Sequence, residues 1–131
     1  MAGKIIADQI EHSTAGSLDT SYVVNGSAKQ WIQFDMSSFT VDDSLNVSTV
    51  SDVATGRSQI NATNAFGSAN RAGASQGSFE NSTDGSANYN TSTVYLRNST
   101  NTSQNYMNFW NRDGTLQDGT NCSGAMFGDL A

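Results

Sequence analysis

Four consecutive residues, Trp110 to Asp113, carry the side-chain types that bind sugars. Trp110, Asn111, Arg112 and Asp113 place an indole beside an amide, a guanidinium and a carboxylate. Aromatic faces stack on sugar rings, while Asn, Arg and Asp side chains supply directional hydrogen bonds. The run stands where an alternating segment leads into a loop, a common position for binding residues. We therefore predict a glycan-binding site here; the alternative is that Trp31 and Trp110 pack at a subunit interface.

The candidate nucleophiles lack a nearby base. His12 is the only histidine and lies beside Glu11, far along the sequence from Cys122. A Cys–His or Ser–His arrangement needs its partners within hydrogen-bond reach. Cys122 is the only cysteine, so it cannot form an intrachain disulfide, and we expect a small, buried, apolar residue. We predict that the protein is not an enzyme.

The aspartate pairs are better explained as turn formers than as catalytic groups. Two carboxylates could in principle cleave a glycan. However, Asp42 and Asp43 are adjacent and point to opposite faces of a strand, and Asp113 and Asp118 lie in a turn-rich loop. The loop oxygens of residues 113–119 could gather around Ca²⁺, but their spacing does not match the EF-hand ligand series. We expect no metal site and no cofactor.

Composition bounds the fold and the partners. The 131 residues suffice for one domain, and their polarity comes from Asn, Ser, Thr and Gly more than from ions. Its net charge of −6 and six scattered basic residues argue against a nucleic-acid partner. No stretch approaches the roughly 20 apolar residues of a membrane span, so no membrane insertion is expected. The small apolar content predicts a homo-oligomer whose subunits share burial.

Alternating apolar residues predict an all-β domain over residues 28–131. In the first strand Gln30, Ile32, Phe34 and Met36 face inward, and Trp31 and Gln33 face outward. Roughly seven to nine short strands predict an antiparallel sandwich or compact barrel. The expected strands include a run through Leu45, Val47 and Thr49, a partner around Ile60, a central strand at 91–97, and strands at 106–111 and 122–128.

Residues 1–27 differ from the remainder and predict an N-terminal arm. Its start is apolar, with Ile5, Ile6 and Ile10 as the expected attachment residues, and a polar spacer follows. We expect an arm that is extended or briefly helical and that docks on something to become ordered. The start of the sequence has no signal-peptide pattern.

Several ordered segments resemble a family of phage proteins. The segments 3–17, 22–31, 42–48, 60–66 and 122–128 are similar to the shared C-terminal module of tail-fibre and virion structural proteins in marine and freshwater tailed phages. The resemblance implies a virion surface component, β-rich and trimeric, attached to the particle through its arm. Because the sequence shows no signal-peptide pattern, we expect synthesis in the host cytoplasm. We expect the module to stand alone here instead of ending a long fibre, which leaves a short capsid fibre or a decoration protein open.

The expected function is therefore binding and assembly. The partners would be two further copies of the chain, another virion protein contacted through residues 1–27, and a host surface glycan. The alternative is a capsid decoration or cement protein, or a short capsid fibre, without a receptor role; a glycan hydrolase is the less favoured reading.

Overall fold

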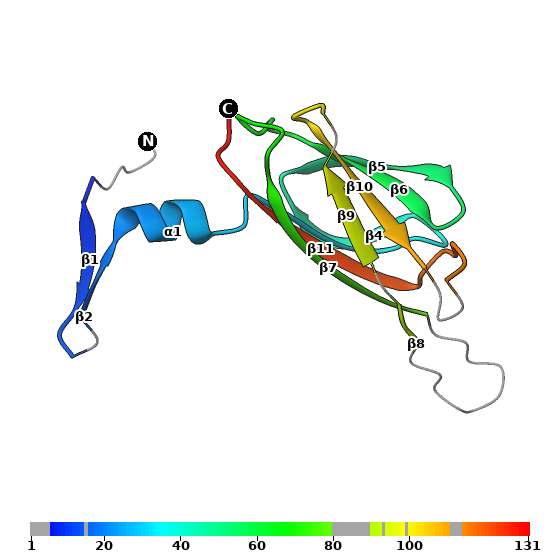
Figure 1. Ribbon diagram of the computed structural model, residues 1–131, viewed down its shortest axis with the longest axis horizontal. Helices are drawn as coiled ribbons and strands as arrows, with labels where there is room; N and C mark the ends of the chain where they lie inside the picture. The colour runs from blue at the N-terminus through cyan, green and yellow to red at the C-terminus, as the bar shows by residue number, and fades with distance from the viewer. Residues whose placement is uncertain (1–5, 15, 80–89, 93, 99, 111–113) are drawn as a thin grey trace.

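The computed structural model describes residues 6–14, 16–79, 90–92, 94–98, 100–110 and 114–131. The side chains of His12, Phe79 and residues 90–98 also fall outside the description. Within the described ranges the chain forms antiparallel sheets and one short helix (Figure 1). The prediction of an all-β antiparallel fold is confirmed.

Two sheets pack face to face. The first has the strand order β4-β3-β11-β7-β8, and the second has the order β5-β6-β10-β9. The strands of the five-stranded sheet are β3 (Gln30–Asp35), β4 (Thr40–Leu45), β7 (Ala72–Phe79), β8 (Asn90–Ser92) and β11 (Asn121–Phe127). Those of the four-stranded sheet are β5 (Val47–Ala54), β6 (Arg57–Ala62), β9 (Val94–Asn98) and β10 (Gln104–Phe109).

The core lies between these sheets and is built by period-two alternation. Both sheets contribute to one buried cluster of Ile32, Phe34, Met36, Ile60, Met107, Phe109 and Cys122. In β3, Gln30, Ile32 and Phe34 are buried as predicted, while Trp31 is half-buried and Gln33 exposed. Successive side chains of a strand point to opposite faces, so the same alternation that fills the core sets the outer face of the sheet.

A buried amide network joins the two sheets at one end of the core. Asn105 of β10 donates from Nδ2 to Gln30 Oε1 over 2.5 Å, and Gln30 Nε2 donates to the Asn46 carbonyl over 3.1 Å. The Asn46 side chain in turn donates to the carbonyls of Lys29 and Asn64. Buried polar groups need such partners, so the network restricts how the sheets can slide.

Two predictions about strand placement are wrong. The segment 91–97 is not a central strand: β8 and β9 are each the outermost strand of a sheet. β-Branched and aromatic residues favour strand formation in general, but they do not indicate whether the strand is central or at the edge of its sheet. Leu45 and Val47 do not share a strand either, because Asn46, with φ of +54°, separates β4 from β5. Asn tolerates this left-handed conformation, and the chain crosses there between the sheets.

The N-terminal segment forms its own small elements. Strands β1 (Gln9–His12) and β2 (Gly16–Asp19) pair as a hairpin, followed by α1 (Thr20–Gly26). A short helical stretch was among the expectations, whereas the hairpin was not. These elements project from the two larger sheets (Figure 1). Lys29 holds the helix end, since its ammonium donates to the carbonyls of Val24 and Ser27. The division into an arm and a domain at residue 27 stays a prediction.

The β5–β6 turn is locked against the end of β10. Gly56 has φ of +69°; its N–H donates to Asp118 Oδ1 over 2.6 Å, and its carbonyl accepts from the Phe109 N–H over 2.9 Å. A Cβ built at this position would lie 2.5 Å from the Gln117 nitrogen. Backbone atoms on the neighbouring loop cannot move aside as a flexible side chain would.

Gly56→Ala should therefore destabilise the fold by two separate costs. Left-handed backbone costs a non-glycine residue roughly 1–2 kcal/mol, and overpacking adds about 1–3 kcal/mol. Gly114→Ala is the matched control, because Gly114 has φ of +75° and nothing within 4 Å of the added Cβ. Urea unfolding of both variants measures the difference. Equal losses of unfolding free energy would show that the close approach at Gly56 has no energetic weight.

Candidate functional site

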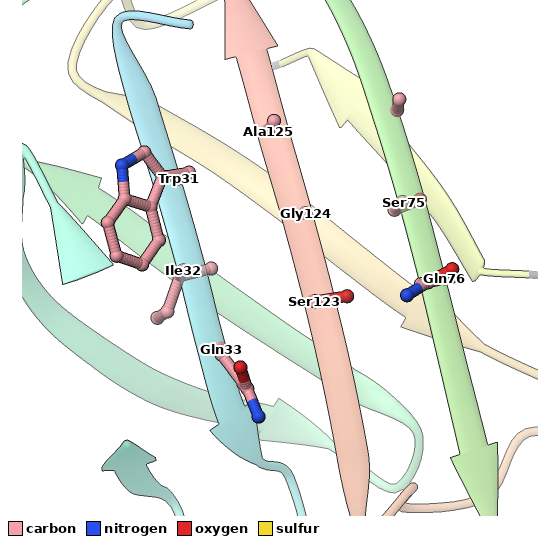
Figure 2. Close-up of a pocket in the computed structure, with 9 residues that line it drawn as sticks. Trp31, Ile32, Gln33, Ser75, Gln76, Ser123, Gly124 and Ala125 are labelled. Atoms are coloured by element: carbon pink, nitrogen blue, oxygen red, sulfur yellow. The ribbon is translucent and has the colours of Figure 1, made fainter. Parts of the chain in front are cut away.

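A shallow trough runs along the outer face of the five-stranded sheet. Its first part is a depression of about 340 Å³ between Trp31 of β3 and Ala74 of β7, with Ala125 of β11 on its floor. A second depression of about 410 Å³ continues past Ser123 to Asn121. The two share Gln33, Gln76 and Ser123, so they form one continuous surface, which we call the β11 trough. Figure 2 shows the residues of the first part.

Strand register creates this trough. Ser123 of β11 lies opposite Gln33 on one side and opposite Gln76 on the other, and Ala125 likewise lies between Trp31 and Ala74. The floor is low because Ser123 and Ala125 of β11 are small, while the longer side chains of Trp31, Gln33 and Gln76 stand on the flanking strands (Figure 2). From Asn121 to Ala125 the floor extends roughly 13 Å, at about 3.3 Å per residue. An extended chain molecule could lie along it.

The polar groups of the trough are available to a ligand. Within the described part of the chain, the side chains of Gln33, Gln76 and Ser123 make no hydrogen bond to the protein. Each glutamine presents both a carbonyl acceptor and an amide donor, and the serine hydroxyl can do either. The half-buried indole of Trp31 borders the same surface. Together they offer an aromatic ring next to a row of neutral hydrogen-bonding groups.

The predicted site at residues 110–113 is described only at its first residue. Trp110 is half-buried directly after β10 and forms an isolated β-bridge with Leu116. Asn111, Arg112 and Asp113 lie outside the described residues. The glycan site predicted there stays a prediction. The β11 trough lies on the other sheet, on β3, β11 and β7.

The predicted attachment residues lie on the surface where they are described. Ile6 is 82% exposed and Ile10 is 53% exposed, whereas Ile5 lies outside the description. Ile10 stands opposite Leu18 in the hairpin register, and Leu18 is also exposed. In α1 no residue is buried. A two-stranded hairpin and a seven-residue helix are marginal in isolation, so this apolar surface is available for a partner.

Three described aspartates, Asp35, Asp43 and Asp118, accept hydrogen bonds from backbone N–H groups. Asp43 Oδ1 accepts from the Ser44 N–H, and Asp118 Oδ1 accepts from Gly56. For Asp35, burial raises the pKa, but hydrogen bonds from Ser37 and Ser38 outweigh it and leave the pKa below its ordinary value. The contacts of Asp35 and Asp43 are local in sequence, whereas Asp118 joins its loop to the β5–β6 turn.

Two kinds of feature are missing from the described residues: a cluster of metal ligands and a membrane-spanning helix. No group of three or more His, Cys, Asp or Glu residues among the described positions could hold a metal ion. Asp113, the first residue of the possible calcium loop, falls outside them. No described helix has the length and apolarity needed to cross a membrane.

Sequence reasoning missed the trough, although part of its signal was present. It placed Trp31 and Gln33 on the outer face of their strand. Ser123 and Ala125, two small residues two positions apart in the last predicted strand, were a further signal in the sequence. What joins these strands is the order β3-β11-β7, which brings residue 123 beside residues 33 and 76 and which local patterns do not encode.

Comparison with known proteins yields one informative likeness. No family model and no curated protein matches the chain. A solved structure that it resembles is titled as the crystal structure of phiAB6 tailspike in complex with three-repeated oligosaccharides of Acinetobacter baumannii surface polysaccharide. The TM-score is 0.54 at 9% identity, and the match covers 92% of this chain. It covers 23% of that tailspike chain, so this chain spans under a quarter of its length. The likeness shows a shared all-β fold.

Cys122 should be chemically inert in the folded protein. Burial, reinforced by the charge of Asp35, raises the pKa of its thiol from 9.0 to about 12. Because the thiolate is the reactive form, native protein should react with a thiol reagent at pH 8 only as fast as it unfolds. Rapid reaction under native conditions would contradict the buried placement.

The same shift predicts a loss of stability at alkaline pH. The unfolded thiol releases its proton near pH 9 while the folded thiol keeps it, so the unfolding free energy should fall as pH rises from 9 to about 12. Cys122→Ala removes this contribution and leaves other titrating groups in place. The difference between wild type and variant, followed by urea unfolding across this range, isolates the thiol.

Proposed function

We propose that this chain is a phage virion surface protein that binds a host surface glycan along the β11 trough, without cleaving it. The supporting observation is the trough itself: an aromatic ring beside a row of neutral hydrogen-bonding side chains that have no partner in the described part of the protein. The all-β likeness to a tailspike is consistent with this proposal.

A largely uncharged glycan segment is the ligand that the trough suits. Its polar row consists of amides and a hydroxyl, which recognise sugar hydroxyls through paired donors and acceptors. Trp31 would contribute apolar contact to the face of a sugar ring. The shallow shape and the floor of roughly 13 Å suit several linked units better than a single small molecule.

Binding without turnover is favoured by the carboxylates beside the trough. Asp35 is on β3, which lines the trough, and Asp43 is on β4, the next strand of the sheet. Most glycosidases need one carboxylic acid whose pKa is raised so that it can protonate the leaving group. Hydrogen bonds from Ser37 and Ser38 instead lower the pKa of Asp35. It is therefore poorly suited to act as the acid.

The N-terminal arm is the proposed attachment element. Its exposed apolar side chains include Ile6, Ile10, Leu18, Tyr22 and Val24. We expect them to be covered by another virion protein, or by the arms of two further copies in a homotrimer. A capsid decoration protein would use the same arm, so the position of the density on imaged particles distinguishes a shell protein from a tail component.

Trp31→Ala should weaken glycan binding with little effect on the fold, because the indole lies on the outer face and outside the core cluster. At about 25 cal/mol per Å² of apolar surface, the loss of roughly 60 Å² of indole contact corresponds to about a tenfold loss of affinity. A glycan array would identify a ligand for the wild type, and calorimetry would compare the variants.

Trp110→Ala is the matched control for that experiment. If the trough is the site, this variant retains affinity; if it loses affinity while Trp31→Ala does not, the site lies at residues 110–113. Circular dichroism confirms that both variants are folded. Unchanged binding in both would contradict a tryptophan-based glycan site.

Removal of residues 1–26 should leave a folded sandwich that no longer joins particles. The core cluster lies entirely within the remaining chain, and α1 buries none of its residues. Mass spectrometry of purified particles made with the truncated protein measures incorporation. Full-length protein supplied from the same plasmid is the control, and particles that carry the truncated chain at normal copy number would refute the attachment role.

A further inference from the structure

A second polar depression lies on the opposite outer face, on the four-stranded sheet. It has a volume of about 100 Å³ and is lined by Val53, Arg57, Tyr106 and Asn108. Arg57 of β6 and Asn108 of β10 are directly paired in the sheet register. β6 thus brings a guanidinium, and β10 a phenol ring and an amide, to one small cavity that Val53 of β5 also borders.

Arg57 is an accessible cation in an acidic protein. Of the other basic residues with described side chains, Lys29 is bound to helix carbonyls and Arg71 is buried against the carbonyls of Asn101, Thr102 and Gln104. Arg57 is exposed and has neither an ion pair nor a hydrogen bond among the described contacts. The nearby carboxylate of Asp118 is bound to the Gly56 N–H instead. This guanidinium can therefore accept an anionic ligand without breaking an internal contact.

Asn108 supplies the second observation. Its residue exposure is only 6%, and yet its side-chain amide makes no hydrogen bond within the described structure. None of its amide atoms is both inaccessible to solvent and without a partner, so the amide keeps some accessible surface. Buried polar groups are normally satisfied, so an amide left open to a cavity indicates a place for a ligand group. The hydroxyl of half-buried Tyr106 is likewise without a described hydrogen bond.

We propose that this cavity binds a sugar unit that carries a carboxylate. Arg57 would hold the carboxylate through paired N–H groups, since a guanidinium matches carboxylate geometry. Asn108 would bond a neighbouring hydroxyl, and Tyr106 and Val53 would contact the ring. The small volume suits one terminal or branching unit. The inference does not rest on the β11 trough, which lies on the other sheet and has a neutral polar row.

The test is a titration of ¹⁵N-labelled protein followed through the side-chain signals of Arg57 Nε–H and Asn108 Nδ2–H. The probes are sodium glucuronate, galacturonate and N-acetylneuraminate, with methyl glucoside as the neutral control and acetate as the carboxylate without a ring. At least one acidic sugar should shift both signals saturably. The two controls should bind at least about tenfold more weakly.

Variants connect the binding to the cavity. Arg57→Gln should weaken acidic-sugar binding by about tenfold or more, because a charge-assisted bidentate contact is lost. Arg57→Lys should retain part of the affinity, and Trp31→Ala should retain all of it. Three results would overturn the proposal: no saturable shift with any acidic sugar, equal binding of acetate or methyl glucoside, or unchanged affinity in folded Arg57→Gln protein. Because Trp31→Ala is tested in parallel, failure here is distinguishable from failure of the trough proposal.

Discussion

The hydrogen bond from Asn105 to Gln30 crosses the sandwich, and the arrangement of both outer faces depends on it. Asn105 belongs to β10 and Gln30 begins β3, and both side chains are buried. Sliding one sheet over the other would separate these amides inside the core, where an unpaired polar group costs roughly 1–3 kcal/mol. The packing of the apolar side chains in the core is less directional and would tolerate small shifts of one sheet over the other. The amide pair therefore selects one relative placement of the sheets.

The relative placement of the sheets also determines which side chains lie on their outer faces. Gln30 faces the core, so Trp31 must face outward, and the register of β3 with β11 then sets Ser123 and Ala125 beside it. On the second sheet Asn105 faces inward, so Tyr106 is placed on the outer side, next to the position where Arg57 meets Asn108. Because side chains alternate between the two faces of a strand, fixing the inward residues Gln30 and Asn105 also fixes which residues lie on the two outer faces. Asn46 extends the same network to the carbonyl of Lys29, whose ammonium holds the end of α1.

Period-two alternation predicted much of the fold from the sequence. Gln30, Ile32 and Phe34 were assigned to the core face because alternation needs only local information, and the antiparallel β class followed from it. Strand order needs information about distant segments. β-Propensity over residues 94–97 could not show that they lie at a sheet edge, and a run of apolar residues through Asn46 did not reveal the crossing there. The trough residues come from three strands separated by dozens of positions, so no local window could assemble them. The run at residues 110–113 was found because its members are adjacent in sequence.

The two outer faces differ in the kind of interaction that their side chains can make with a ligand. In the β11 trough Gln33, Gln76 and Ser123 offer hydrogen bonds without net charge, so their interaction with a ligand depends on donor and acceptor geometry and is little affected by ionic strength. On the opposite face Arg57 contributes a full charge, whose attraction for an anion is screened by salt. A net charge of −6 repels anionic ligands over long range, so a guanidinium placed beside a recessed amide must act locally. One scaffold can in this way present a salt-tolerant surface for an extended neutral ligand and a salt-sensitive cavity for a single acidic group.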